Sequence, residues 1–174
     1  MVHSVELLFD EDTEAAVRAV WQDLADAGIR SLAGHNSPTN RPHVTLTVAD
    51  DLDAAADRAL RPLLDRLPLP CVIGAPMLFG SGRALILVRL LVPTAELLEL
   101  QAQIYRLTRP YMPNGPLAHA DPGHWTPHVT LARRVPTDLL GTALGLRRVT
   151  RDIRGTAVAL RHWDGNAKVV HPIG

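Results

Sequence analysis

The chain has 174 residues, of which 47% are hydrophobic, and it carries as many acidic as basic side chains. This hydrophobic content is enough for a packed interior and excludes global disorder, and the length suits a single domain. A formal net charge of zero excludes a protein held on nucleic acid by bulk electrostatics, although a local basic patch is compatible with it.

Cysteine usage and hydropathy indicate a cytoplasmic protein. Cys71 is the one cysteine, so no internal disulfide can form, and we expect its thiol to be buried and inert. No Cys/His cluster has the spacing of zinc ligands, and we expect neither metal nor cofactor. The N-terminal residues lack a basic segment followed by an apolar one, and no apolar run approaches the length of a membrane span.

The first half of the sequence alternates predicted strands and helices. Residues 2–9 predict a strand, and Asp10 can cap a helix in which Val17, Val20, Trp21 and Leu24 recur at helical spacing. The elements that follow are a polar loop (33–42), a strand (43–48), a helix (51–67) and a strand (69–80).

The order then repeats after the glycine-rich turn at 80–82. Thr94 can cap a helix with a stripe of Leu97, Leu100, Ile104 and Leu107, and Thr137 can cap a short helix. The other predicted elements are a strand (83–91), a long loop (109–127), a strand beginning at residue 128, and two final strands (152–164 and 167–173). Trp21 and Trp163 are predicted core residues, whereas His35, His119 and His124 are predicted at the surface.

One pentapeptide, PHVTL, stands at residues 42–46 and again at 127–131. Cys71 follows His43 at the same interval as Thr156 follows His128, and both are predicted strand residues. The repeat therefore predicts a duplicated lobe: one bilobal domain over 1–174, with a first lobe over about 1–80 and a second over about 81–174.

Strand geometry places the polar residues of each repeat on one face. Side chains alternate along a strand, so His43 and Thr45 point one way, about 7 Å apart at their Cα atoms. His128 and Thr130 do the same in the second copy. If the lobes pack with these faces inward, a cleft holds two imidazoles and two hydroxyls.

That set of side chains suits the cleavage of a phosphodiester. One neutral imidazole can deprotonate the nucleophile and one protonated imidazole can protonate the leaving oxygen, which predicts a bell-shaped pH–rate profile. The hydroxyls of Thr45 and Thr130 can donate to the non-bridging phosphoryl oxygens, and the mechanism needs no metal ion. The alternative is that the four residues are ordinary strand histidines and threonines.

The two motifs, His43-Val44-Thr45-Leu46 and His128-Val129-Thr130-Leu131, resemble the signature of the two-histidine phosphoesterase superfamily. This superfamily includes 2′-5′ RNA ligases and RNA 2′,3′-cyclic phosphodiesterases, and the resemblance covers nearly the whole chain. It implies an α+β fold of two ferredoxin-like lobes, each with an antiparallel sheet and two helices, around a pseudo-twofold central cleft.

The resemblance also implies roles and substrates. His43, Thr45, His128 and Thr130 would be catalytic, with His128 as the base that activates water and His43 as the acid, although a pseudo-symmetric site could run either way. The substrates would be the cyclic phosphates of RNA ends or of small nucleotides, opened to 2′-phosphates.

Four further residues are candidates for substrate binding. Arg133 and Arg134 follow the second motif and could hold a phosphate. Strand parity favours Arg134, the resemblance favours Arg133, and a β-bulge would reconcile the two. A nucleobase could stack on Trp125 or Tyr111, which flank the loop over 109–127, although packing of that loop is the competing interpretation.

Two other functions compete with hydrolysis. The same histidines could catalyse 2′-5′ RNA ligation by the reverse phosphoryl transfer. A non-catalytic RNA-binding module is the third alternative, although aromatic residues make up only 4% of the chain and supply few stacking platforms. An ATP-driven ligase is excluded, because the single lysine, Lys168, lies in no ligase motif. Nothing in the sequence requires assembly, so we expect a monomer.

Overall fold

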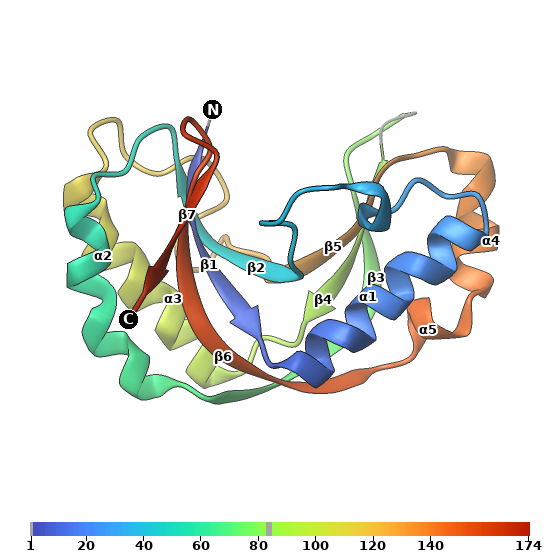
Figure 1. Ribbon diagram of the computed structural model, residues 1–174, viewed down its shortest axis with the longest axis horizontal. Helices are drawn as coiled ribbons and strands as arrows, with labels where there is room; N and C mark the ends of the chain where they lie inside the picture. The colour runs from blue at the N-terminus through green and yellow to red at the C-terminus, as the bar shows by residue number, and fades with distance from the viewer. Residues whose placement is uncertain (1, 83–84) are drawn as a thin grey trace.

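A computed structural model describes residues 2–82 and 85–174, so the first two residues of the strand predicted over 83–91 lie outside it. Seven strands form one antiparallel sheet (Figure 1). The strands are β1 (His3–Phe9), β2 (His43–Ala49), β3 (Leu69–Phe79), β4 (Leu85–Leu91), β5 (His128–Val135), β6 (Ile153–Asp164) and β7 (Val169–Ile173).

In the described parts of the chain, five α-helices and four short 3₁₀ segments connect these strands. The helices are α1 (Glu11–Asp26), α2 (Ala55–Leu60), α3 (Ala95–Thr108), α4 (Leu140–Gly145) and α5 (Arg147–Thr150). The 3₁₀ segments are η1 (Leu32–Gly34), η2 (Arg61–Arg66), η3 (Arg109–Tyr111) and η4 (Thr137–Leu139). The α+β class is therefore confirmed. No helix within the described ranges is long and apolar enough to cross a membrane.

The strand order is β1-β2-β5-β4-β3-β6-β7, and β1 also pairs with β6. The pairings fall into matching sets: β1–β2 corresponds to β4–β5, and β1–β6 corresponds to β4–β3. Strands β2 and β5, which carry the two copies of the pentapeptide, are neighbours in this order. Both halves of the chain thus contribute to a single large sheet. The matching pairings support the predicted lobe duplication, which stays a prediction.

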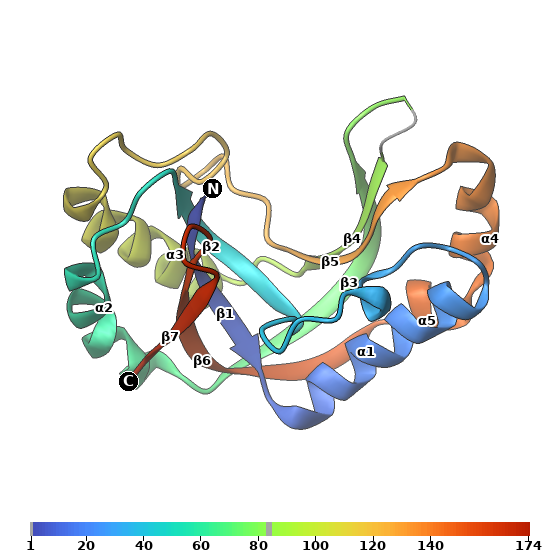
Figure 2. The same ribbon diagram turned by 45° about the horizontal axis from the view of Figure 1, so that its top comes forward.

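The helices lie at two ends of the curved sheet (Figures 1 and 2). Helix α1 packs against β5, β6 and α5, although it directly follows β1 in the chain. Helix α3 packs against β2 and α2, although it directly follows β4. A helix from each half of the chain therefore covers the motif strand of the other half: α1 covers β5, and α3 covers β2.

Most predicted helix starts are confirmed. The Asp10 carboxylate accepts a hydrogen bond from the Thr13 backbone N–H, and the Thr94 hydroxyl accepts one from that of Leu97. The prediction for Thr137 is wrong: this residue is the first of η4, preceded by Pro136, and its side chain caps nothing. Leu107, the last residue of the predicted apolar stripe of α3, is exposed, unlike Leu97, Leu100 and Ile104.

The helix predicted over 51–67 is shorter than expected. Helix α2 ends at Leu60, and the chain continues as the 3₁₀ segment η2 with Pro62 in its first turn. A proline lacks a backbone N–H and cannot continue the α-helical hydrogen bonding, which is the physical reason for the change.

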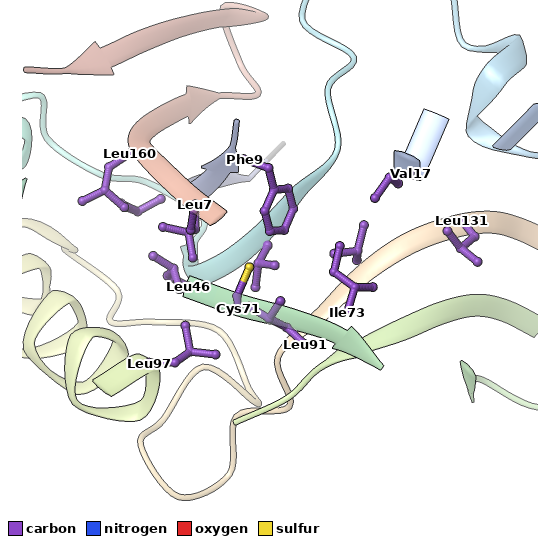
Figure 3. Packing of buried hydrophobic residues seen from close by; sticks show 14 of the residues in the cluster. Leu7, Phe9, Val17, Leu46, Cys71, Ile73, Leu91, Leu97, Leu131 and Leu160 are labelled. Atoms are coloured by element: carbon purple, nitrogen blue, oxygen red, sulfur yellow. The ribbon is translucent and has the colours of Figure 1, made fainter. Parts of the chain in front are cut away.

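The core is built from the apolar faces of the strands and from α1 and α3. Figure 3 shows side chains from four strands, Leu7, Leu46, Cys71 and Leu91, gathered with Leu97 of α3 in one interior. Cys71 is buried as predicted, and this burial raises the pKa of its thiol to about 11.

Candidate active site

The two copies of the motif lie side by side on neighbouring strands of the sheet. Strands β2 and β5 run antiparallel, with Val44 directly opposite Val129. Both valines are fully buried, whereas the histidine and threonine on either side of each are half-buried. The alternation predicted from the sequence is thus present in both strands, and the four polar side chains share one face.

The register also fixes how the four side chains are arranged. Continued by one residue in each direction, the Val44–Val129 pair places His43 opposite Thr130 and Thr45 opposite His128. The two histidines are then diagonal neighbours, with backbone positions about 7–8 Å apart. Each imidazole lies beside the hydroxyl of the other motif, so a group bound between the rings is within reach of all four side chains.

Both imidazoles are held by the same backbone hydrogen bond. Nδ1 of His43 lies 2.7 Å from the carbonyl oxygen of Arg41, and Nδ1 of His128 lies 2.7 Å from that of Thr126. A carbonyl oxygen can only accept, so Nδ1 must carry a proton in each ring. Nε2 is therefore the nitrogen that gains or loses a proton in the site.

Two tryptophans hold the backbone of the motif threonines. The indole N–H of Trp125 donates to the carbonyl oxygen of Thr45 at 2.9 Å, and that of Trp21 donates to the carbonyl oxygen of Thr130 at 3.1 Å. Trp21 belongs to α1 and Trp125 to the loop before β5. Each indole fixes the strand segment that carries a hydroxyl and an imidazole.

Two cavities meet at the motif residues. The larger, with a volume of about 810 Å³, is lined by both histidines and by Thr45, Glu6, Arg133 and Arg161, among others. The smaller, of about 470 Å³, contains Thr45 and His128 again, together with Phe79, His124 and Trp125. The larger cavity is rich in arginine and the smaller in aromatic side chains, so the motifs separate two different environments.

An ion pair that sequence reasoning missed lies beside His43. The carboxylate of Glu6 in β1 accepts hydrogen bonds from Arg161 Nε at 2.7 Å and from the Ser4 hydroxyl at 2.8 Å. Its Oε1 atom lies 3.6 Å from Nε2 of His43. Glu6 and Arg161 are both buried yet both line the larger cavity. The only sequence signal was a lone acidic residue inside an apolar predicted strand.

His128 has different surroundings. The edge of its ring meets the ring of Phe79, with centroids 4.8 Å apart and planes at 70°. Burial is the main reason why the pKa of His128 is lowered; the hydrogen bond with the Thr126 carbonyl opposes this, and the smaller effects of the positive charges of His43 and Arg133 lower the pKa further. The two motif histidines therefore differ in charge environment although their sequences match.

The end of β5 contains the β-bulges that reconcile the two arginine predictions. The register with β4 is irregular after Thr130 and again at Arg134, which adopts a positive φ of 57°. The first irregularity shifts strand parity, so that Arg133 shares the face of His128. Both arginines line the larger cavity and are exposed, and neither forms an ion pair with any described residue.

The structure places the aromatic candidates differently from one another. Trp125 lines the smaller cavity, whereas Tyr111 in η3 packs against the core and lines neither cavity. Trp163, predicted as core, is half-buried and lines the larger cavity, so that prediction is wrong. The reason is that Trp163 shares a strand face with Arg161, and this end of that face lines the larger cavity and not the hydrophobic core. His35, His119 and His124 are exposed as predicted.

Acidic and metal-ligating side chains are sparse around the motifs. Within residues 2–82 and 85–174, no three His, Cys, Asp or Glu side chains lie where they could hold a metal ion. What the site offers is therefore two imidazoles, two hydroxyls and unpaired arginines, which together can bind an anion and move protons.

Solved structures of other proteins share this fold over almost the whole chain. Usb1 of Kluyveromyces marxianus has a TM-score of 0.57 at 14% identity, with 99% of this chain and 97% of Usb1 covered. The MHV ns2 PDE domain has a TM-score of 0.53 at 16% identity, with 99% of each chain covered. E. coli LigT complexed with phosphate has a TM-score of 0.52 at 14% identity, with 99% and 95% covered. No curated protein matches the chain in sequence.

The fold, with a His-x-Thr motif on each of two adjacent strands, is that of the two-histidine phosphoesterase superfamily. The chain belongs to the 2'-5' RNA ligase superfamily, whose family model matches residues 10–167. That range includes both motifs, so the resemblance seen in the sequence is confirmed.

Proposed function

We propose that the protein is a metal-independent phosphodiesterase that opens 2′,3′-cyclic phosphates of RNA ends or small nucleotides to 2′-phosphates. The observation that carries the proposal is the pairing of β2 with β5, which gathers His43, Thr45, His128 and Thr130 on one face. Both histidines and Thr45 line the larger cavity, and Thr45 and His128 also line the smaller one. Two imidazoles presenting Nε2 atoms and two hydroxyls are the groups that such a reaction requires.

The reaction proceeds by one displacement at phosphorus. A neutral imidazole takes a proton from water as the water oxygen attacks, and a protonated imidazole gives its Nε2 proton to the ribose 3′ oxygen as the P–O bond breaks. The hydroxyls of Thr45 and Thr130 donate to the non-bridging oxygens, where negative charge accumulates. Water and the cyclic diester become a 2′-phosphomonoester and a free 3′ hydroxyl, and the two rings exchange protonation states.

The cavities support a nucleotide substrate that spans both environments. Arg133 and Arg134, which lack ion-pair partners among the described residues, would hold phosphate oxygens in the larger cavity. The aromatic wall that includes Trp125 would accept the flat face of a base in the smaller one. Solved structures of proteins with this fold contain ligands of the same class: Usb1 with uridine monophosphate and LigT with phosphate or ATP.

Incubation with nucleoside 2′,3′-cyclic phosphates and with short RNAs bearing cyclic ends, in the presence of EDTA, tests the proposal. Phosphorus NMR then identifies the product. We expect a 2′-phosphomonoester, and a loss of turnover by at least about a hundredfold in either His43→Ala or His128→Ala. His171→Ala is the matched control, because that exposed histidine of β7 lies outside the motifs and lines neither cavity.

The other outcomes separate the competing functions. Turnover abolished by EDTA would contradict the metal-independent mechanism, and joining of RNA ends with a 2′-5′ linkage would favour the ligase. Retention of RNA without any turnover, unchanged in both histidine variants, would favour a binding module.

A further inference from the structure

We propose that Glu6 is a positioning residue that keeps the His43 imidazole protonated and thereby makes His43 the acid of the pair. Glu6 lies outside both motifs, on β1, directly opposite Thr45 in the β1–β2 register. The catalytic part of this inference rests on the proposed function, whereas the effect of Glu6 on the His43 ring does not.

The geometry aims one carboxylate oxygen at the ring. Oε2 of Glu6 is taken by Arg161, which stands opposite Glu6 in the β1–β6 register, and Oε1 is held by Ser4. Oε1 is also the atom that lies 3.6 Å from Nε2 of His43. Because Nδ1 of that ring already donates to the Arg41 carbonyl, a proton on Nε2 is the one that faces Glu6. A negative charge at this distance favours the imidazolium form.

Other charged groups act on the same ring. Arg30 and, from β5, Arg133 and Arg134 line the cavity with His43, and their positive charges oppose a positive charge on the imidazole, whereas the charge of Glu6 favours one. From β6, the Arg161 guanidinium is bound to the carboxylate oxygen farther from His43. The guanidinium of Arg41 is bound to Glu14 of α1, at 2.6 Å, so its charge is compensated there. From β5, His128 repels a second positive charge, which favours a state in which one ring alone is protonated.

Nothing equivalent to Glu6 faces His128. No described carboxylate forms an ion pair with it, and the aromatic ring of Phe79 occupies its edge. Burial and the neighbouring positive charges also lower the pKa of His128, which supports a neutral ring there. The site is therefore symmetric in its motifs and asymmetric in its charges. His128 takes the proton of water, and His43 supplies the proton to the ribose 3′ oxygen.

Titration of the histidine ring signals by NMR, without substrate, tests the proposal directly. Glu6→Gln keeps the shape of the side chain and removes its charge. We expect His43 to lose its ring proton at a pH lower by about one unit or more than in the unsubstituted protein. The alkaline limb of the kcat profile should move by the same amount, with about a tenfold loss of kcat on that limb. Glu6→Asp should recover most of the shift.

Two further variants keep the test decisive. Glu6→Gln leaves the buried Arg161 unpaired and can unfold the protein, so the double variant Glu6→Gln/Arg161→Gln removes both charges together. It should show a smaller shift in the same direction. Glu99→Gln, which removes an exposed carboxylate on α3, should leave the titration unchanged.

A folded Glu6 variant whose His43 signals titrate as in the unsubstituted protein would overturn the proposal. If the ring titration shifts and no cyclic phosphate is hydrolysed by the unsubstituted protein, Glu6 has the inferred effect and the proposed function is wrong. If turnover is present and the kcat profile does not follow the ring titration, Glu6 sets the charge of His43 but His43 is not the acid.

Discussion

Replacing Gly155 of β6 with alanine should destabilise the protein, because Thr13 of α1 occupies the space that a side chain at position 155 would need. A Cβ atom at position 155 would stand 2.3 Å from Oγ1, 2.5 Å from Cγ2 and 3.0 Å from Cβ of Thr13. Thr13 cannot retreat easily, since its Oγ1 accepts a hydrogen bond from the Thr156 backbone N–H and its own N–H is held by Asp10. We expect the free energy of unfolding to fall by about 2–3 kcal/mol.

Thr13→Ala should relieve most of that overlap. Alone, it should cost about 1–2 kcal/mol, because the Thr156 N–H loses its partner. In the double variant with Gly155→Ala, the two atoms closest to the new Cβ are gone, so the effects should fall short of their sum by about 1.5–2 kcal/mol. Gly141→Ala is the matched control: no atom lies within 4 Å of its added Cβ, and it lies in α4, where alanine favours the helix.

Urea unfolding followed by far-UV circular dichroism measures all four variants. Additivity of the two substitutions to within about 0.5 kcal/mol would refute the reasoning, because it would mean that Gly155 and Thr13 do not compete for space. The contact matters for the site as well, since α1 carries the Trp21 indole that holds the Thr130 carbonyl.

Three more predictions follow from the site and its surroundings. Arg133→Ala should raise KM for an RNA with a cyclic end about tenfold or more, as the loss of a charge-assisted bond implies, whereas Arg147→Ala, on exposed α5 outside both cavities, should not. Trp125→Phe should lower the free energy of unfolding by about 1 kcal/mol in urea titrations, since the Thr45 carbonyl loses its donor; an unchanged midpoint would contradict this. Burial lowers the pKa of both His128 and His162 in the folded protein, so the unfolded chain binds more protons below the ordinary value of 6.5. Stability should therefore fall as the pH drops below 6.5, and His128→Asn should lessen that fall.

The sequence predicted the local features of the site well, because they depend on neighbours in the chain. Period-two alternation in each motif placed a histidine and a threonine on one face, and the burial of Val44 and Val129 agrees with that. The helix caps at Asp10 and Thr94 are equally local, since each involves a side chain and a backbone N–H three residues away. The family resemblance then supplied the expectation that the motifs meet.

The features that the sequence did not predict depend on long-range register. Glu6 and Arg161 meet through the β1–β6 pairing, across most of the length of the chain, and neither residue stands near a motif in sequence. The direction of Arg133 depends on where β5 bulges against β4, which the periodicity of one strand does not encode. The crossing of α1 and α3 to the far strands is likewise a property of the assembled sheet.

The carbonyl oxygens that hold the two motif imidazoles belong to the main chain, at Arg41 and Thr126, one residue before Pro42 and Pro127. A backbone carbonyl remains available as a hydrogen-bond acceptor whatever side chain its residue carries. The tautomer of each imidazole is therefore a property of the path of the backbone, and the prolines restrict that path. Substituting Pro42 or Pro127 with alanine would loosen that path without changing any side chain of the two motif histidines and threonines.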